Sequence, residues 1–512
     1  MEARYKQIMH DRGLPFNADL EQSQQFTMQP SIFQMLSDVL QDYDICTLKQ
    51  SPQQLINGLY LKVALAEARA YSMMSFAWML LRVYNEGNFT AEQQYGEETY
   101  LQYSADILQE SYSVMLKASN EFRTCDPKQH SEGETFVQIT ELLQGVIENE
   151  VDMNNGGTCQ QNCAYYEHAR SEGCFYSETQ YCGSHRRCGG TLHNCGFYDA
   201  DAWVCKSKNP YKRYDYILYE NNVRLGPQGS CKGDQIKVDS WWRWFVHCSY
   251  CFCMCDDGNS TTTDRFVSLM PVLSDTKKNM VVTGIKFTKQ RGVIHMKIQQ
   301  GQALPQGQVN STTLRWQDVE PINIKSSAYQ NGVHYKKLSY EERNIDLDRL
   351  TAIESHVVTG VRFRMLGGHL NLEVQITPVN FTTGELRPFK SYWISNDNTP
   401  AMAKNPRREI SVVNLDIPTR YPGSTRIDSV PDSFIRFGPS SITLDAAQST
   451  IPFFDAQTVA PVPASWMSGV ELYHKGRRGT GGFLGLQVMT YNTSQHTQEF
   501  EGHKVVINQV DY

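Results

Sequence analysis

Long apolar runs are missing from this sequence of 512 residues. The best one, from Met73 to Leu81, has about half of the ~20 residues that a membrane-spanning helix needs, so we expect no membrane span. Long basic runs are missing too, and 48 basic side chains stand against 55 acidic ones. Because a protein that coats a polyanion needs a basic stripe, we also expect no nucleic-acid partner.

Familiar catalytic motifs are missing as well. The sequence contains no H-E-x-x-H motif of a zinc protease, no G-x-S-x-G nucleophile elbow and no phosphate-binding P-loop. The stretch from Gly479 to Gly485 misses the dinucleotide-binding fingerprint by one position, and we interpret it as a hairpin turn. We therefore predict a protein that is not an enzyme and that has no catalytic residue, cofactor or metal.

Cysteine is missing from the last 257 residues, yet twelve of the 14 cysteines lie between Cys159 and Cys255. The stretch from Gly156 to Gly196 has almost no aliphatic residues, so it should not order without crosslinks. An oxidising compartment converts such cysteines into disulfides, and Cys46 and Cys125 could pair with each other. We predict disulfides at all of them: Cys46, Cys125, Cys159, Cys163, Cys174, Cys182, Cys188, Cys195, Cys205, Cys231, Cys248, Cys251, Cys253 and Cys255.

A zinc site is the alternative for the segment HCSYCFCMC, which contains Cys248-x-x-Cys251. A structural zinc site usually needs two such ligand pairs, and the sequence has no second C-x-x-C pair. In an extended strand, Cys251, Cys253 and Cys255 share one face, which suits a strand bridged to several neighbours. This pattern favours disulfides and leaves a Cys/His metal-binding module as an alternative function.

The N-terminal sequence, MEARYKQIMHDRGLPFNADLEQ, has neither the apolar core nor the small-residue cleavage site of a signal peptide. The cysteines nevertheless predict a secreted, extracellular protein. We therefore expect either a trimmed or mispredicted gene start or another route of export.

Residues 1–150 show the 3.6-residue hydrophobic period of helices. One helix is expected over about 30–42, and a second, apolar nearly all round, over about 51–84. Two more are expected to begin at Thr90 and Ser131. Because short polar links join these segments, the pattern favours an antiparallel four-helix bundle.

From Asp264 onward the hydrophobic period is two, which predicts mostly β-strands. This part contains three related hairpins near residues 281–299, 357–377 and 466–490, each with a glycine-containing turn between two strands. Repetition of one unit implies stacking or rotation about an axis. The pattern favours a β-prism-like fold, the plan of some lectins and egg-coat proteins, with a β-sandwich as the alternative.

The expected fold class is thus an α+β multidomain protein. Its three parts are a helical bundle over 1–150, a cysteine-rich disulfide-bonded connector over 151–258 and an all-β module over 259–512. A ligand would be expected on the loops of the β module.

Asparagine sequons of the form Asn-x-Ser/Thr occur five times. Three of them follow the three hairpin repeats at similar distances, as equivalent exposed loops would. In a secreted protein such sites accept glycans. We predict glycosylation at Asn88, Asn259, Asn310, Asn380 and Asn492.

Several longer segments carry a family resemblance. They are DSWWRWFVHCSYCFCMCDD (Asp239 to Asp257), the two VVTG copies, HLNLEVQITP (His369 to Pro378) and GVELYHKGRRGTGGF (Gly469 to Phe483). They resemble an arthropod family of secreted proteins that carry a domain of unknown function, over about residues 159–495. The resemblance implies secretion, and it supplies no established activity and no catalytic residues. Members of that family generally start with a leader.

Four carboxylates lie close together in the sequence at Glu341, Glu342, Asp346 and Asp348. A carboxylate pair could serve a secreted hydrolase that cleaves glycosides, or could bind calcium. A solvated acidic edge is the simpler interpretation, and we favour it.

The aromatic residues Trp241, Trp242 and Trp244 lie beside Cys248. They could form a platform for a sugar or a partner protein, although such residues more often pack against a neighbouring layer. Overall we expect a non-enzymatic binding or structural role in the extracellular space, of which lectin-like binding is one form. The expected partner is an extracellular protein or a carbohydrate, and a carboxylate-dependent hydrolase is the alternative.

Overall fold

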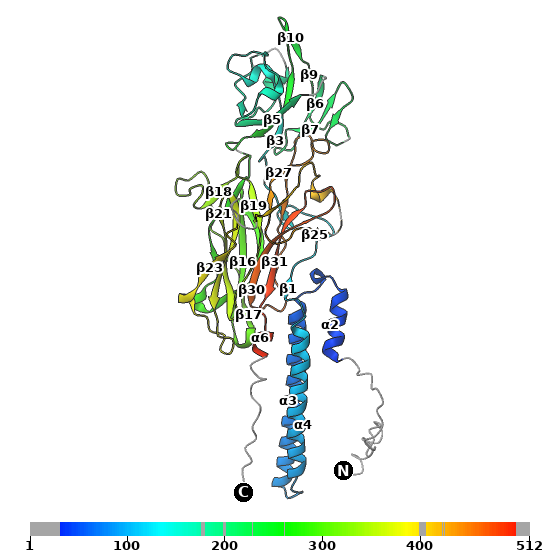
Figure 1. The fold of residues 1–512 in the computed structure, drawn as a ribbon, viewed down its shortest axis with the longest axis vertical. Helices are drawn as coiled ribbons and strands as arrows, with labels where there is room; N and C mark the ends of the chain where they lie inside the picture. Colours follow the sequence, from blue (N-terminus) through cyan, green and yellow to red (C-terminus); the bar gives the residue numbers. More distant parts are fainter. Residues whose placement is uncertain are drawn as a thin grey trace.

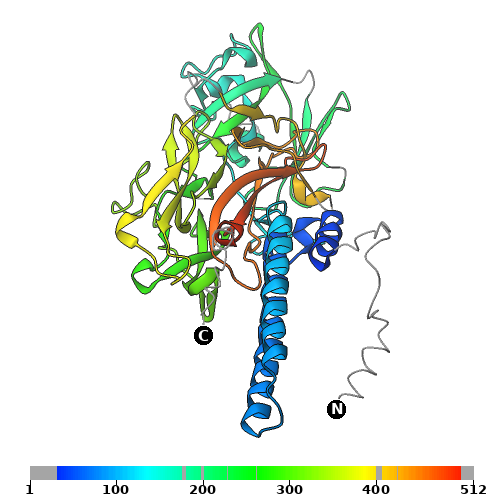
Figure 2. The ribbon, with the colours of Figure 1, turned by 60° about the horizontal axis from the view of Figure 1, so that its bottom comes forward.

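An elongated molecule is seen in the computed structural model, which describes residues 31–175, 180–197, 201–227, 229–260, 262–398, 406–421, 423 and 425–497. A helical hairpin projects from a β-rich body, and the cysteine-rich unit lies at the other end of that body (Figures 1 and 2). Within the described ranges, no helix has the length and apolarity needed to cross a membrane. Residues 1–30, to which the expectation about a signal peptide refers, lie outside these ranges.

The projecting hairpin consists of α3 (Pro52–Val83) and α4 (Thr90–Met115), with α2 (Ile32–Asp42) packed beside its base. The hydroxyl of Ser51 accepts a hydrogen bond from the backbone N–H of Gln54, and the side-chain oxygen of Gln54 accepts one from the backbone N–H of Ser51, so α3 starts with a capping box. The buried core of this unit lies at its base, where Phe33, Ile56, Val114 and Met115 meet.

The helix expected from Ser131 is not formed, so the described residues do not form the expected four-helix bundle. This segment instead provides β2 (Phe136–Val137) and β3 (Gln144–Asn149). Phe136 and its apolar neighbours enter the large core of the β-rich body, and every residue of β3 is buried. A pattern that fits one helix face was therefore overruled by burial on both faces of a sheet.

The cysteine-rich unit contains two small sheets. One has the order β3-β12-β5-β4 and the other the order β8-β7-β6-β9. A separate hairpin is formed by β10 and β11. The strand bounds are β4 (Ala169–Arg170), β5 (Thr191–Phe197), β6 (Ala202–Lys206), β7 (Tyr214–Tyr219), β8 (Arg224–Leu225), β9 (Gln235–Val238), β10 (Trp241–Arg243), β11 (Val246–Cys248) and β12 (Tyr250–Asp256); α5 spans Gln180–Ser184.

Seven disulfides are formed by the 14 cysteines, and none is free. The expected alternation along β12 is observed, because Cys251, Cys253 and Cys255 are all buried and each is bridged to a different partner. Phe252, between them, belongs to the core of the second sheet. The pairs are Cys46–Cys125, Cys159–Cys248, Cys163–Cys251, Cys174–Cys182, Cys188–Cys255, Cys195–Cys253 and Cys205–Cys231.

All three expected repeats are antiparallel hairpins. They are β15 (Met280–Gln290) with β16 (Val293–Ala303), β21 (His356–Leu366) with β22 (His369–Pro378), and β30 (Met467–Gly476) with β31 (Phe483–Thr490). In each hairpin the register shifts just before the repeat glycine, Gly284, Gly360 or Gly469. A Cβ atom at any of the three would lie within 2.7 Å of a crossing chain segment or its side chains, which explains the glycine.

These hairpins form a cycle through the segments between them. Each second strand pairs in parallel with the strand β13, β19 or β29. The chain then crosses to the next hairpin, where β14 pairs with β21, β20 with β30, and Val459 with Ile285. The bounds are β13 (Phe266–Ser268), β14 (Val272–Leu273), β19 (Asn344–Leu347), β20 (Arg349–Thr351) and β29 (Phe453–Asp455).

Shorter strands complete the sheets of the body. They are β1 (Glu121–Phe122), β17 (Val309–Trp316), β18 (Tyr335–Lys337), β23 (Tyr392–Ser395), β24 (Arg408–Ile410), β25 (Arg426–Ile427), β26 (Ser433–Arg436), β27 (Gly438–Pro439) and β28 (Thr450–Ile451); α6 spans Ser494–Thr497. One core cluster takes apolar side chains from all three hairpins, including Phe287, Phe363 and Leu472. The β-rich body thus has its own core, and no cysteine belongs to that cluster.

A buried histidine in β16 leads us to expect a pH-dependent stability of this body. His295 is buried, and burial lowers the pKa of its imidazole to about 4. In the unfolded chain the imidazole takes up a proton near pH 6.5, whereas in the folded chain it does so only near pH 4. The free energy of unfolding therefore falls as the pH drops from about 6.5 to 4. We expect wild type to lose about 3 kcal/mol more over this window than His295→Gln. Denaturant unfolding at several pH values measures this, with exposed His168→Gln as the control. Equal pH profiles for wild type and His295→Gln would contradict the assignment.

Candidate functional site

A polar cleft opens in the cysteine-rich unit, with a volume of about 750 Å³. It is lined by residues of both small sheets and by the loops between them. The lining is rich in carboxylate, amide and hydroxyl groups and has a few aromatic rings. Its members include Glu150, Gln160, Gln161, Asn162, Phe197, Asp201, Tyr219, Glu220, Asn221, Ser240, His247, Ser249 and Tyr250. Such a surface presents many hydrogen-bonding groups to a polar ligand.

Two carboxylates that line this cleft, Asp201 and Glu220, lie beside a third, that of Asp239. Oxygen atoms of Asp201, Glu220 and Asp239 lie within 4.8 Å of one another. The ammonium group of Lys237 lies 3.0 Å from Glu220 and 2.9 Å from Asp239, and these two hydrogen bonds raise the pKa of Lys237. The backbone and hydroxyl of Ser240 donate to Asp201 at 2.7 and 2.6 Å. A lysine thus pairs with two of the three carboxylates, and the third accepts its hydrogen bonds from Ser240.

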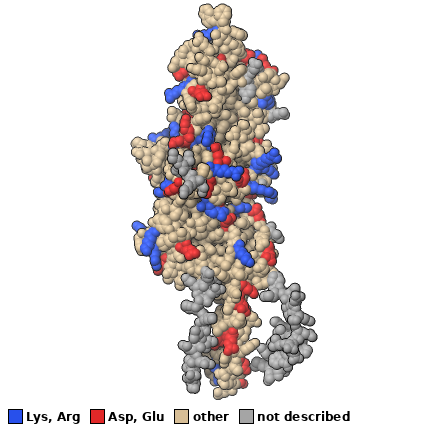
Figure 3. All heavy atoms as spheres, viewed as in Figure 1, with Lys and Arg blue, Asp and Glu red and all other residues tan. Residues whose placement is uncertain are grey.

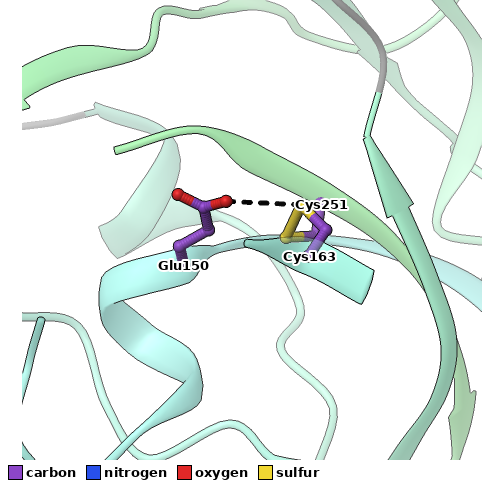
Figure 4. A group of neighbouring side chains, drawn as sticks. All are labelled: Glu150, Cys163 and Cys251. Atoms are coloured by element: carbon purple, nitrogen blue, oxygen red, sulfur yellow. Dashed lines mark hydrogen bonds between the residues drawn. A yellow bond between two sulfur atoms is a disulfide. The ribbon is translucent and has the colours of Figure 1, made fainter. Parts of the chain in front are cut away.

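The carboxyl group of Glu150 lies in the wall of the cleft, directed at a disulfide (Figure 4). One of its oxygens accepts a hydrogen bond from the backbone of Ser249 at 3.0 Å, and the other lies 3.7 Å from Sγ of Cys163. Because Cys163 is bonded to Cys251, that sulfur carries no proton. Burial raises the pKa of Glu150, which favours the acid form, the only form that can donate a proton to the sulfur. These two sulfurs cannot act as metal ligands.

An aromatic hairpin rises from the rim of the cleft. Ser240 and His247 line the cleft, and the hairpin between them carries Trp242, Trp244 and Phe245, which are 70%, 88% and 93% exposed. Its tip is at one end of the long axis of the molecule (Figure 1). Trp241 instead packs beside the Cys159–Cys248 disulfide. The packing role favoured from the sequence therefore holds for Trp241 and is wrong for the other two tryptophans.

A family model described as a domain of unknown function, DUF4803, matches residues 43–298, half of the chain. The chain belongs to the DUF4803 family. The matched region includes the helical hairpin, the cysteine-rich unit with its cleft, and the first β-hairpin up to the middle of β16. It starts before the expected resemblance over 159–495 and ends before the second and third hairpins. No curated protein matches the chain.

The carboxylates predicted from the sequence lie outside the DUF4803 cleft and do not act as a pair. Asp346 and Asp348 are fully buried in the β-rich body. Both oxygens of Asp348 accept hydrogen bonds from Arg407, at 2.7 and 2.8 Å, while Asp346 contacts His369 at 2.7 Å. Burial raises the pKa of Asp348, against the effect of Arg407. Their oxygens are engaged inside the protein, so they do not form the open carboxylate pair of a glycoside hydrolase.

The other two predicted carboxylates, Glu341 and Glu342, are exposed on a loop. Glu341 lies with His168 and His193 in a group whose ligand atoms are within 4.8 Å of one another. Two imidazoles and a carboxylate suit zinc, but a zinc-binding imidazole usually donates its other N–H to a carboxylate or carbonyl. Among the described residues, the contacts of both rings are aromatic, His168 with His193 and His193 with Tyr340. This group therefore lacks the surroundings of a built metal site.

The five sequons differ in exposure. Asn88, Asn259 and Asn380 are exposed, whereas Asn310 and Asn492 are half-buried. The side-chain oxygens of Asn310 and Asn492 accept hydrogen bonds from the hydroxyl groups of Thr312 and Ser494 in their own sequons, at 2.8 and 2.6 Å. Three sequons are thus open to a modifying enzyme in the folded chain.

Sequence reasoning missed most of the cleft. Glu150, Asp201 and Glu220 are far apart along the chain and meet only through the two sheets. Phe245 could have been found, because it directly follows the tryptophans and lies in the turn between β10 and β11. The ligand was expected on loops of the β module, whereas this cleft lies in the cysteine-rich unit.

Proposed function

We propose that this protein is a secreted, disulfide-bonded glycoprotein that binds carbohydrate without catalysis, through the cleft and the aromatic hairpin of its cysteine-rich unit. The observation that carries the proposal is the exposure of Trp242, Trp244 and Phe245 on a hairpin whose base lines a polar cleft. Sugar rings combine hydroxyl groups with apolar C–H faces. A surface that binds them therefore combines hydrogen-bonding groups with exposed aromatic rings.

The aromatic hairpin is held in place by the unit below it. Trp242 lies opposite His247 in the ladder, with ring centroids 5.0 Å apart. Cys248 at the end of the hairpin is bonded to Cys159, which also lines the cleft. Exposed aromatic rings on a fixed support lose little conformational entropy on binding, so they suit recognition.

Secretion is supported by the sulfur chemistry. Seven disulfides would not persist in a reducing cytosol. Exposed Asn88, Asn259 and Asn380 are the sequons we propose to be glycosylated first, and the proposal extends to Asn310 and Asn492. The cyclic pairing of the three hairpins supports a β-prism-like body, the expected plan that is shared with some lectins.

Glycan-array binding followed by calorimetry on the best glycan tests the proposal. We expect Trp244→Ala/Phe245→Ala to weaken binding at least about tenfold, about 1.4 kcal/mol, because it removes the stacking surface and leaves the fold intact. Asp201→Asn should weaken binding through the cleft. Phe389→Ala is the matched control, since Phe389 is 83% exposed on a different part of the chain.

Two results would contradict the carbohydrate proposal. The first is a wild-type protein that binds none of the glycans. The second is a Trp244→Ala/Phe245→Ala variant that binds them as wild type does. Binding to an extracellular protein, lost on the same variant while no glycan binds, would assign the surface to a protein partner instead.

A further inference from the structure

The outer side of α3 carries an apolar surface that the rest of the described chain leaves uncovered. Leu65, Met73 and Phe76 are more than half exposed, at 51%, 68% and 58%. The helix projects away from the body together with α4, so no sheet covers it (Figure 2). A soluble protein rarely keeps such a contiguous apolar surface in water, and an uncovered one marks an interaction site.

The spacing of these residues places them on one face. The face contains five apolar residues at successive spacings of 4, 11, 4 and 3: Leu61, Leu65, Phe76, Leu80 and Val83. With 3.6 residues per turn, each spacing is close to one or three full turns, so the five side chains lie on one side of the helix. The side of α3 that faces α4 is a different one, where Tyr71 stacks on Tyr100 and Trp78 lies over Gly96. The two helices of the hairpin are thus already paired, and a second seam remains on α3.

Opposite charges on the two helices indicate what covers this seam. Lys62 and Arg69 lie along the exposed side of α3. The helix α4 has five acidic residues and no basic one: Glu92, Glu97, Glu98, Asp106 and Glu110. Acidic side chains are visible on the projecting hairpin (Figure 3). Among the described residues no ion pair joins α3 to α4, and Arg82 donates to the amide oxygen of Gln93 instead. The basic residues of α3 in one hairpin therefore complement the acidic residues of α4 in a second hairpin, and the reverse.

We propose that the uncovered face of α3 binds the helical hairpin of a second copy of this chain, so that two hairpins form an intermolecular four-helix bundle. The 32 residues of α3 give a seam of ~48 Å, whose area is of the order of the ~800 Å² per partner that a specific dimer buries. Lys62 and Arg69 of one copy lie near the α4 carboxylates of the other. The bundle expected from the sequence within one chain is then completed between two.

A lipid bilayer fits this hairpin less well than a second copy does. The uncovered face carries Lys62 and Arg69 among its apolar residues, and a bilayer would have to accommodate these cations without a carboxylate to pair with them. In a dimer the same cations stay at the solvated edge of the bundle and meet the α4 carboxylates of the second copy. The hairpin and the aromatic tip lie at opposite ends of the molecule, so both clefts of the dimer stay open for binding (Figure 1).

Sedimentation equilibrium of the oxidised full-length chain tests the proposal. We expect a mass of twice 58.5 kDa for wild type at micromolar concentration and of one chain for Leu65→Glu/Phe76→Glu. Val413→Glu/Phe389→Glu is the matched control, because these side chains are 70% and 83% exposed on other parts of the chain. This variant should stay dimeric. Unchanged circular dichroism of the variant shows that α3 and α4 remain folded.

Charge reversal tests the identity of the occupant. Lys62→Glu/Arg69→Glu and Glu98→Lys/Asp106→Lys should each weaken the homodimer at least about tenfold, and a mixture of the two variants should form a heterodimer. A wild-type mass of one chain, or a dimer unaffected by Leu65→Glu/Phe76→Glu, would overturn the proposal. Deletion of residues 1–30 that turns a wild-type monomer into a dimer would assign the face to that segment. Flotation with phosphatidylcholine vesicles, lost on Leu65→Glu/Phe76→Glu, would assign it to a lipid surface.

Discussion

Replacing Arg265 by methionine is expected to lower the free energy of unfolding by about 3–5 kcal/mol. The guanidinium of Arg265 is fully buried, and its N–H groups donate to the backbone oxygens of Glu141 at 2.6 Å and Leu142 at 3.0 Å, and to the carboxylate of Asp256. Further bonds reach Thr263 at 3.0 Å and the backbone oxygen of Leu338 at 3.4 Å. Methionine fills the space but leaves the largely buried carboxylate of Asp256 without its cation, and it removes one donor from each of three carbonyl groups.

The position of Arg265 explains why this loss is large. Glu141 and Leu142 lie where the chain enters the cysteine-rich unit, Asp256 lies where it leaves it, and Leu338 belongs to the β-rich body. One side chain therefore holds the unit that carries the cleft against the body that supports it. Denaturant unfolding of the oxidised protein measures the effect. Arg436→Met, which removes a half-exposed ion pair with Glu409 at 3.6 Å, should cost less than about 1 kcal/mol. Equal losses for the two variants would contradict this account.

Removing the disulfide between Cys188 and Cys255 should cost about 4 kcal/mol. Both cysteines are buried in a cluster that consists largely of disulfide-bonded cysteines and a few apolar residues. The bond closes a loop with a sequence separation of 67 residues. Release of a loop of this length raises the entropy of the unfolded chain, which stabilises the unfolded state by about 4 kcal/mol. The cluster has few apolar contacts to compensate. We therefore expect Cys188→Ala/Cys255→Ala to unfold the cysteine-rich unit first and to abolish ligand binding.

A shorter loop provides the matched comparison. The bond between Cys174 and Cys182 spans a separation of only 8 residues, so Cys174→Ala/Cys182→Ala should cost about 2.5 kcal/mol. Limited proteolysis and denaturant unfolding of the oxidised variants give the two values. A larger loss for the short loop than for the long one would show that chain entropy is not what these crosslinks supply.

The β-hairpins could be predicted from the sequence because their information is local. Alternating side chains and a glycine-containing turn specify a hairpin within about 20 residues, and the repeat appears three times. The alternation of Cys251, Cys253 and Cys255 likewise specifies one face of one strand. What this local information does not contain is the crossing of β14, β20 and Val459 between sheets.

The segment from Ser131 to Val146 shows where the same reasoning fails. Phe136, Ile139, Leu143 and Val146 have helical spacing, but they are distributed between the core of the β-rich body and the disulfide cluster. Apolar residues buried on all sides give a similar pattern whether the segment is a helix or a strand. The identity of the neighbouring layers decides, and those layers come from distant parts of the chain.

The cleft could not be predicted for a related reason. Its carboxylates Glu150, Asp201 and Glu220 come from three separate strand ends, and no motif spacing joins them. The outer face of α3 was visible in the sequence as a helix that is apolar nearly all round. A helix of this kind is usually buried inside a bundle, and under our proposal the hairpin of a second copy covers it.

We propose that covalent sulfur bridges hold the cysteine-rich unit and that the protein works outside the cytosol, where such bridges persist. Alkylation of the unfolded native protein without reductant, followed by intact mass measurement, tests it most directly. The account predicts that none of the 14 cysteines is modified without reductant and that all are modified after reduction. Fourteen modified cysteines before reduction, or a bound metal ion released on unfolding, would contradict it.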